Sequence, residues 1–408
     1  MKPLEEARSE VLSSVGLVDV EQVPIWQASG RVLASDVVAP ENVPPFANSA
    51  MDGFAVRAAD VSASGSVLEV VGDLPAGSST DLSVGPGQAI KIMTGAPMPP
   101  GADTVARVED TTAEGSKVTI STAVEPGTSV RPAGGDVYAG QVVFSAGTRL
   151  SPMHVGVLAT MGVQPEVFKR PQVAFMSTGD ELTAPEAGGL QPGAIRDSNR
   201  PMLLALLEDA GVEPIDLGII PDDPEVLRAA LTRAAEADVV VSTGGVSMGD
   251  YDVTKLVLQG DAQVDFWQVA IQPAKPFAFG RLGDALFFGL PGNPVSVLVS
   301  FEQFARPSLL KMQGAHAILR PQLVASAGET FDTDPEKTVF VRVVVEGLEE
   351  GSPTVAKSGG QASNVLSAAA DADGFGIVPR GTATIEPGEP VTVEMFKWPE
   401  SRKWIDGR

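Results

Sequence analysis

The sequence contains no cysteine and only two histidines, His154 and His316. Without cysteine there can be no disulfide framework, no thiolate nucleophile and no cysteine-ligated zinc or iron–sulfur centre. Two histidines that lie far apart in the sequence also exclude a histidine-rich metal site. The chemistry that remains open uses carboxylates, hydroxyls, lysine, arginine, backbone amides and a bound hard cation.

Several common functional motifs are missing as well. No Gly-Lys dipeptide occurs, which excludes a Walker A loop, and neither GxGxxG nor HExxH is present. This argues against ordinary P-loop NTPases, nicotinamide-dependent dehydrogenases and zinc proteases. No apolar run approaches the roughly 20 residues of a membrane span, and the N-terminus lacks the apolar core of a signal peptide. We therefore expect a soluble, cytoplasmic protein that is not in a membrane.

Positive charge is scarce relative to negative charge. The chain has 52 Asp and Glu residues against 29 Lys and Arg residues, which gives a formal net charge of −23. Every part of the chain is acidic, so a solvated surface accounts for most of the excess. Nucleic-acid binding needs clustered lysine and arginine and is not expected. An anionic substrate would require local cations or a bound metal ion.

The patterning predicts several domains. Apolar residues at helical spacing over 4–15 predict an amphipathic helix, and from about 40 to 135 short β-like runs alternate with Gly-Pro, Pro-Pro and Pro-Gly pairs. From about 171 to 312 strands and helices alternate, which is typical of a largely parallel sheet with helices on both faces. Short strands return after about 315 and predict a small C-terminal β-barrel or sandwich.

Glycine-rich loops follow two of the predicted strands. The strand at 239–241 leads into STGGVSMGDYD, and the strand at 173–176 leads into STGDE. Glycines let backbone amides approach a phosphate closely, and Asp250 and Asp252 could hold a hard cation that bridges phosphate oxygens. Each loop alone is also compatible with an ordinary tight turn. Their shared position at the carboxyl edge of one parallel sheet favours a binding site.

A third segment combines a lysine with two turn-forming sequences. QPAKPFAFG places Lys275 between prolines, and the stiff backbone suits a fixed phosphate contact. GLPGNPVS then ends a strand and starts a helix, whose first amides can meet an anion. The alternatives are a surface lysine and turn chemistry alone. Three segments of the β-rich region, SAMDGFA, IMTGAP and RPAGGD, are each more typical of a turn than of a site when taken singly.

Taken together, these segments resemble the molybdopterin molybdenumtransferase family, which includes bacterial MoeA and the E domain of gephyrin. The stretch TGGVSMGDYD marks the wider molybdopterin-binding fold, which an adenylyltransferase acting one step earlier shares. The full set is specific to the transferase, and the resemblance covers essentially the whole chain. The matching segments, in family order from about residue 49 to 296, are SAMDGFAV, IMTGAP, RPAGGD, FMSTGDEL, RDSN, STGGVSMGDYD, KPFAFG and LPGNPVS.

The resemblance implies an α/β plus β fold in a multidomain chain that works as an elongated homodimer, with sites near the subunit interface. Its α/β domain has a doubly wound, mainly parallel sheet. The implied domains are a helical segment-paired domain (residues 1–40 and 136–168), an inserted β-rich domain (41–135), the α/β molybdopterin-binding domain (169–315) and a C-terminal β-barrel (316–408).

The resemblance also implies a reaction. Members take molybdate and adenylated molybdopterin, release AMP in a Mg²⁺-dependent step and leave molybdenum on the pterin dithiolate. The absence of cysteine is compatible with this chemistry, because the pterin brings the sulfur ligands. Expected partners are an upstream adenylyltransferase-type protein and molybdoenzyme acceptors. The alternatives are a molybdopterin adenylyltransferase and a non-catalytic, pterin-binding scaffold.

Site roles follow from the resemblance at matching positions. Catalytic roles fall on Asp52, Thr94, Asp136, Glu181 and Lys275. Substrate binding falls on Arg131, Ser177, Thr178, Gly179, Gly244, Gly245, Ser247, Pro291, Asn293, Arg342 and Ser363, and metal binding on Asp222, Asp250 and Asp252.

The chain departs from the family pattern at three positions. Gln272 and Ala274 stand where the family commonly has a second lysine and a glycine, and Ala362 precedes Ser363 where a glycine is common. The change at Gln272 removes one cation from the lysine loop, and we expect this loss to weaken the binding of phosphate or molybdate.

Overall fold

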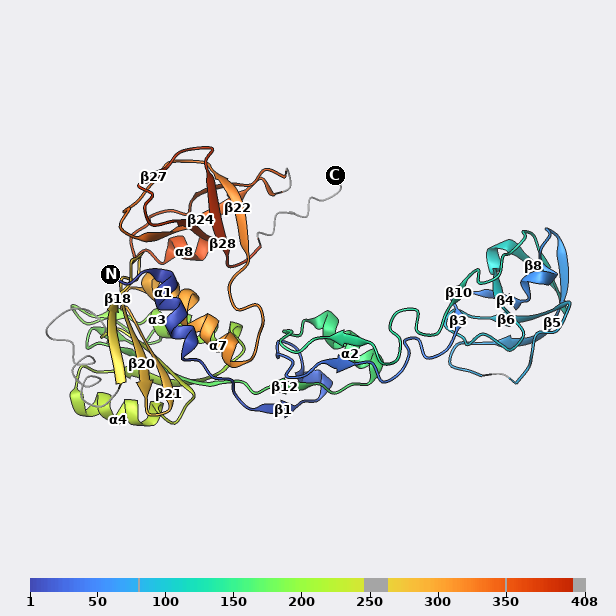
Figure 1. The fold of residues 1–408 in the computed structure, drawn as a ribbon, viewed down its shortest axis with the longest axis horizontal. Coiled ribbons are helices and arrows are strands. Elements are labelled where there is room, and N and C mark those ends of the chain that lie inside the picture. The colour runs from blue at the N-terminus through green and yellow to red at the C-terminus, as the bar shows by residue number, and fades with distance from the viewer. Residues whose placement is uncertain (80, 246–262, 349–350, 399–408) are drawn as a thin grey trace. The chain divides into compact units, whose positions relative to one another are not determined.

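The computed structural model describes residues 1–79, 81–245, 263–348 and 351–398. The chain forms two compact units (Figure 1). In sequence, the two stretches of the second unit lie between the three stretches of the first. Unit 1 comprises Met1–Glu21, Gly30–Ala34 and Val167–Arg408, and unit 2 comprises Gln22–Ser29 and Ser35–Glu166.

A six-stranded sheet in the order β16-β13-β17-β21-β20-β18 forms the centre of unit 1. The first four strands in this order are parallel to one another, and the last two join antiparallel. The strands are β13 (Gln172–Thr178), β16 (Glu213–Ile220), β17 (Val239–Thr243), β18 (Gln263–Gln268), β20 (Pro276–Leu282) and β21 (Ala285–Leu290).

Helices cover both faces of this sheet, which is why its central strands are almost entirely apolar. Val239 and Val241 pack into one core and Val240 into the other. Figure 1 shows α4 beneath the sheet and α1, α3 and α7 above it. The helices are α1 (Leu4–Ser13), α3 (Asn199–Asp209), α4 (Pro224–Ala234), α6 (Pro294–Ser300), the π-helical turn η4 (Phe301–Ala305) and α7 (Arg306–Met312).

A closed barrel forms the C-terminal part of unit 1. Five strands pair in the order β24-β25-β22-β28-β26, and pairing of β24 with β26 closes the ring. The short strand β19 (Ile271–Gln272) pairs with β24 and so connects the lysine loop to the barrel. The barrel strands are β22 (Gln322–Ala327), β24 (Thr338–Glu346), β25 (Thr354–Lys357), β26 (Gly374–Val378) and β28 (Pro390–Met395).

The parallel α/β sheet and the barrel confirm the predicted fold class. Smaller elements complete unit 1: β14 (Leu182–Thr183), β15 (Ile195–Arg196), β23 (Phe331–Asp332), β27 (Thr384–Ile385) and α8 (Ser367–Asp371). None of the helices in the described ranges is both long and apolar enough to cross a lipid bilayer.

Unit 2 is built on a curled sheet in the order β7-β4-β6-β5-β9-β8. Two antiparallel strand pairs lie outside this sheet, β3 with β10 and β2 with β11. They pair the part of the chain that precedes the sheet with the part that follows it. The sheet contains β4 (Gly53–Val56), β5 (Ser66–Leu74), β6 (Gln88–Ile92), β7 (Thr104–Arg107), β8 (Thr111–Glu114) and β9 (Lys117–Ile120).

The remaining elements of unit 2 are short, apart from one helix of three turns. They are η1 (Ile25–Gln27), β2 (Val37–Val38), β3 (Asn48–Ser49), η2 (Ala58–Asp60), η3 (Val108–Asp110), β10 (Val130–Arg131), β11 (Val142–Phe144) and α2 (Pro152–Met161). The short strands β1 (Val20–Gln22) and β12 (Glu166–Phe168) lie where the chain passes from one unit to the other.

A buried polar cluster joins the barrel to the helices of unit 1. The Gln303 side chain in η4 donates to Glu394 Oε1 on β28 at 2.8 Å, and Arg8 donates to Gln303 Oε1 at 2.7 Å. The neighbouring Glu302 accepts two hydrogen bonds from Arg320 at 2.9 and 3.0 Å. Burial, with a further contribution from the charge of Glu302, raises the pKa of Glu394 to about 7.

We predict that Glu394→Gln stabilises the protein much more at pH 8 than at pH 5. A carboxyl group whose pKa is raised on folding stabilises the folded state when protonated. That contribution is complete below its usual pKa of 4.5 and is lost as the pH rises through about 7. Glutamine keeps the acceptor for Gln303 without the charge, so its advantage should approach about 3 kcal/mol above pH 8.

Urea unfolding midpoints measured between pH 5 and pH 8 test this. The exposed carboxylate Glu346 on the same barrel provides the control variant Glu346→Gln. A stability difference between Glu394→Gln and the natural protein that does not change with pH would contradict the prediction.

Candidate active site

Three strand ends meet at one edge of the α/β sheet. Ser177 of β13 lies opposite Thr243 of β17, and Thr243 lies opposite Leu290 of β21. Their loops therefore leave the sheet side by side, and a cavity of about 730 Å³ lies where they meet. Of the predicted residues, it is lined by Thr178, Gly179, Glu181, Asp222, Gly244, Gly245, Pro291 and Asn293.

Close approach of the strand ends requires glycine at position 244. Gly244 has φ +86°, and a Cβ atom there would lie 2.6 Å from the Thr178 carbonyl oxygen. Its backbone N–H donates to the Leu290 carbonyl at 3.1 Å, which holds the loop across the ends of β17 and β21. The conformation leaves backbone, rather than side chain, along this part of the cavity.

Ser177 lies beneath the cavity and not on its wall. Its side chain is fully buried, and its hydroxyl is within 3.1 Å of both Asp197 Oδ1 and Thr243 Oγ1. Asp197 also accepts the backbone N–H groups of Asn199 and Arg200 at 3.1 Å each, so it caps α3. The RDSN segment stands out in the sequence, but no local pattern indicates that Asp197 connects a strand end to a helix start.

Carboxyl groups gather on one side of the cavity, where Glu181 and Asp222 line it. Asp222 donates its backbone N–H to Asp180 Oδ1 at 3.0 Å. Burial raises the pKa of the Asp222 carboxyl, and the nearby charges of Asp180 and Glu181 raise it further. This is an arrangement that a bound cation would relieve.

The predicted metal site can be followed only in part. Asp250 and Asp252, and with them the predicted substrate-binding Ser247, lie outside the described residues. Within the described ranges, no group of three Asp, Glu or His side chains is placed to hold a metal ion. Asp222 is thus the one predicted metal ligand whose surroundings are known.

A second cavity of about 400 Å³ adjoins the first, because Pro276 and Asn293 line both. It lies between the lysine loop and the barrel. The exposed side chain of Lys275 is on its wall, and the Lys275 carbonyl accepts the Val269 N–H at 2.8 Å. The polar residues that line it are Gln272, Lys275, Asn293, Ser296, Asp332, Thr333, Lys337, Lys357, Gln361 and Ser363.

Arg342 supports this second cavity from behind. The residue is fully buried in β24, and burial lowers its pKa. Its guanidinium donates to the carbonyls of Gly360 at 2.7 Å and Ala362 at 3.2 Å, so it holds the loop that carries Ser363. Among the described residues its Nε and Nη1 atoms have no hydrogen-bond partner.

The Ser363 carbonyl accepts the Val295 N–H at 3.1 Å, which attaches the same loop to the start of α6.

The alanine at position 274, where the family commonly has glycine, has a structural consequence in the lysine loop. Ala274 has φ +77° and is buried, so the lysine loop places a Cβ atom in the left-handed region that favours glycine.

Four predicted residues belong to unit 2, and the structure brings two of them together. The backbone N–H and the hydroxyl of Thr94 donate to Asp52 Oδ1 at 2.7 and 2.8 Å. These hydrogen bonds lower the pKa of Asp52, which stays an exposed carboxylate. Arg131 lies in β10 opposite Asn48, and Asp136 donates its N–H to the Val43 carbonyl at 3.0 Å.

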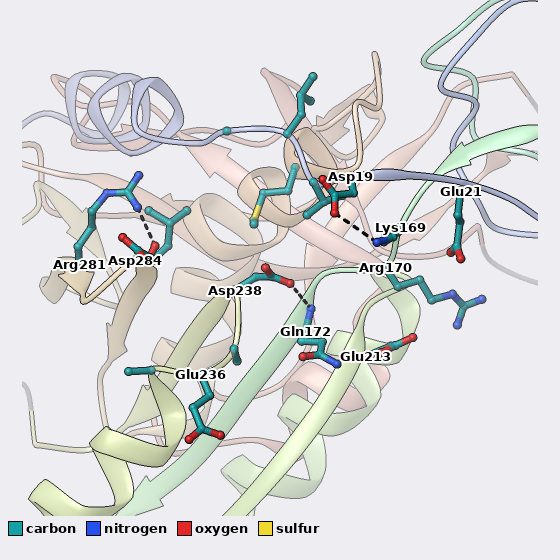
Figure 2. A pocket seen from close by; sticks show the side chains of 17 residues that line it. Asp19, Glu21, Lys169, Arg170, Gln172, Glu213, Glu236, Asp238, Arg281 and Asp284 are labelled. Atoms are coloured by element: carbon teal, nitrogen blue, oxygen red, sulfur yellow. Dashed lines mark hydrogen bonds and ion pairs between the residues drawn. The ribbon is translucent and has the colours of Figure 1, made fainter.

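A cavity of about 770 Å³ lies at the opposite edge of the sheet, where β13, β16 and β17 begin (Figure 2). Several of its charged groups have local partners. Figure 2 shows Lys169 beside Asp19, at 3.2 Å, and Asp238 accepting the Gln172 N–H at 2.8 Å. Ligands of parallel sheets bind at the carboxyl ends of the strands. We therefore assign the candidate site to the two joined cavities at that edge.

Comparison with protein families covers nearly the whole chain. Residues 2–162 match the model of the MoeA N-terminal region (domain I and II), residues 174–311 match the probable molybdopterin binding domain, and residues 324–396 match the MoeA C-terminal region (domain IV).

Individual proteins are similar over their full length. The molybdopterin molybdenumtransferase of Haemophilus influenzae is 38% identical, and the match covers 97% of this chain and 99% of that protein. Molybdopterin molybdenumtransferase 2 of Mycobacterium tuberculosis is 37% identical, with 96% and 99% covered. The crystal structure of the molybdopterin biosynthesis moeA protein from Pyrococcus horikoshii has a TM-score of 0.83 and 31% identity, and covers 97% of this chain and 100% of that one.

We predict that Gly244→Ala destabilises the protein and that Gly292→Ala does not. An alanine at 244 would carry both an unfavourable φ and a clash with Thr178, at a cost of about 1–3 kcal/mol. At Gly292 the nearest atom to a new Cβ is the Gly244 Cα at 3.9 Å, which is ordinary contact. Thermal unfolding of the two variants checks this, and equal midpoints would contradict it.

Proposed function

The chain belongs to the molybdopterin molybdenumtransferase family, and from that membership we propose that it inserts molybdenum into molybdopterin during molybdenum cofactor biosynthesis. The proposed substrates are molybdate and adenylated molybdopterin, the proposed co-product is AMP, and the proposed metal requirement is Mg²⁺. The observation that carries the proposal is the pair of joined cavities, one acidic and glycine-rich, the other lined by lysines.

The cavity at the sheet edge suits the pterin nucleotide. Exposed backbone at Gly244 and Gly245 and the polar side chains of Thr178 and Asn293 can approach phosphate oxygens closely. Cleavage of the substrate pyrophosphate breaks a phosphorus–oxygen bond, and negative charge builds on the departing phosphate. Preorganised donors aimed at that oxygen lower the barrier.

The donor chemistry of the acidic side fits Mg²⁺, which prefers carboxylate oxygens together with water and substrate phosphates. Asp222 would be the ligand from the described residues. Burial is the main cause of the raised pKa of its carboxyl, and the nearby charges of Asp180 and Glu181 add to it. When bound, Mg²⁺ would polarise phosphoryl oxygens.

The lysine-lined cavity suits the oxyanion. Molybdate is a hard, tetrahedral dianion, and ammonium, hydroxyl and amide donors are its natural partners. Lys275 and Ser363 lie on the wall of this cavity. Arg342 keeps the Ser363 loop in place and adds a buried positive charge behind it.

The two alternative functions are less well supported. Adenylyl transfer with ATP would need only the α/β sheet and its loops, and it leaves unit 2 and the barrel without a purpose. A non-catalytic scaffold would not need the acidic and the lysine-lined cavities to adjoin. The products of the reaction distinguish both alternatives from molybdenum insertion.

We also propose that the protein acts as a homodimer in the cytoplasm. Helix α2 of unit 2 contains no Asp, Glu, Lys or Arg, and the adjacent η1 presents Trp26 with 94% of its surface exposed. Met153 of α2 is 74% exposed. A helix that is apolar around its circumference is usually buried, and a second copy of the chain would bury this one.

The net charge of −23 affects how substrate arrives. Long-range repulsion slows the encounter with an anionic pterin nucleotide in solution. Direct transfer from an upstream adenylyltransferase-type protein, and onward delivery to a molybdoenzyme acceptor, would avoid that step.

The reaction assay follows directly. Purified protein incubated with adenylated molybdopterin, molybdate and Mg²⁺ should release AMP and yield active cofactor, and omission of Mg²⁺ should abolish both. A parallel incubation with molybdopterin and ATP should form no adenylated product. Absence of AMP release at saturating molybdate would refute the proposed reaction, and replacing molybdate by tungstate measures the choice of oxyanion.

The dimer has its own test. Trp26→Glu should raise the dimer dissociation constant at least about tenfold, because it places a charge in the centre of the proposed interface. Light scattering coupled to size-exclusion chromatography measures the mass. Leu17→Glu, at an apolar residue of unit 1 that is 65% exposed, is the matched control. A natural protein that is monomeric, or a Trp26→Glu variant that remains fully dimeric, would contradict the proposal.

A further inference from the structure

The barrel contributes two lysines to the second cavity that no motif indicated. Lys337 and Lys357 line it together with Lys275, and Asp332 is the one carboxylate among the described lining residues. Three lysines and one carboxylate therefore line this cavity, in a chain whose net charge is −23. A local concentration of cations is what an anion-binding site in an acidic protein requires.

Strand pairing places Lys337 beside the lysine loop. In the β19–β24 pair, Ile271 lies opposite Thr338 and Gln272 opposite Val339. The Thr338 N–H donates to the Ala270 carbonyl at 2.9 Å. Lys337 directly precedes the first paired residue of β24, so its backbone is level with Ala270, two residues before Gln272 on the neighbouring strand.

The two barrel lysines differ in how firmly they are held. The Lys357 amino group donates to the Thr330 carbonyl at 2.7 Å, lies 3.6 Å from Glu329 and sits 5.3 Å from the centre of the Phe331 ring. These three contacts give it a structural role in the barrel.

Lys337 has a simpler environment. It forms an ion pair with Asp334, three residues earlier, at 2.7 Å, and 21% of its side chain is exposed. Partly exposed ion pairs between near neighbours contribute little to stability. The ammonium group has three N–H donors and the contact with Asp334 does not occupy all of them, so the group can also bind a second anion.

We propose that Lys337 is a substrate-binding residue that acts with Lys275 on the oxyanion. One cation comes from the lysine loop and the other from the barrel, so the dianion would be bound from both sides of the cavity. The inference rests on the proposed function, which supplies molybdate as the ligand. Gln272, which lines the same cavity, is uncharged. In this proposal Lys337 supplies the second positive charge.

The test compares three variants in the full-length protein. Lys337→Gln should weaken molybdate binding, measured by calorimetry, by about tenfold at low ionic strength, as expected for loss of one charged hydrogen-bond donor. The KM for molybdate in AMP release should rise to the same extent, with kcat nearly unchanged. Both effects should shrink as salt is added, because partly exposed charges are screened.

Asp334→Asn is the matched control, since it breaks the same ion pair from the other side without removing the lysine. It should leave molybdate affinity unchanged or increase it. Lys337→Gln combined with Gln272→Lys should recover part of the lost affinity, because residue 272 lies on the wall of the same cavity.

The outcomes separate this inference from the function on which it rests. If the natural protein shows molybdate-dependent AMP release but Lys337→Gln binds molybdate normally, the role of Lys337 is refuted and the function stands. Equal losses of affinity in Lys337→Gln and Asp334→Asn would also refute it, by assigning the effect to the ion pair. If the natural protein neither binds molybdate nor releases AMP, the proposed function fails, and the role of Lys337 fails with it.

Discussion

The parallel register of β13, β17 and β21 is the constraint on which the candidate site depends. It places Ser177, Thr243 and Leu290 side by side, so that three loops leave the sheet at one level. Side chains alternate between the two faces of a strand, and a slip of one residue would exchange the two hydrophobic cores beneath these loops. The same strand register therefore determines both the packing of the sheet and the geometry of the site.

The strand pair β19–β24 sets a second relation, between the lysine loop and the barrel. It brings the lysines of the second cavity next to the acidic cavity at the sheet edge, with Pro276 and Asn293 shared by both. A phosphate group in the acidic cavity would need a bound cation beside it, whereas an oxyanion in the second cavity would meet lysine side chains directly. The excess of acidic residues, by contrast, is spread over the whole chain, so the net charge does not indicate the charge at the site.

Much of this could be predicted from local sequence. Alternating strand and helix patterns predicted the α/β sheet, because runs such as Val239–Val241 occur where both faces are buried. Glycine positions predicted the loops, since residues such as Gly244 adopt backbone conformations that other residues avoid. Asp197 was missed because its four acceptor contacts join a strand end to a helix start across 20 residues.

The sequence by itself narrowed the possible chemistry, through the absence of cysteine, and it determined the family, through motifs that are local and in order. Only the tertiary structure decided which residues share a cavity. Ser177 carries a motif hydroxyl yet is buried beneath the site, whereas Lys337 belongs to no motif yet lines it. The reason is physical: spacing along a chain specifies backbone conformation, but proximity between segments more than 60 residues apart arises from strand pairing and packing.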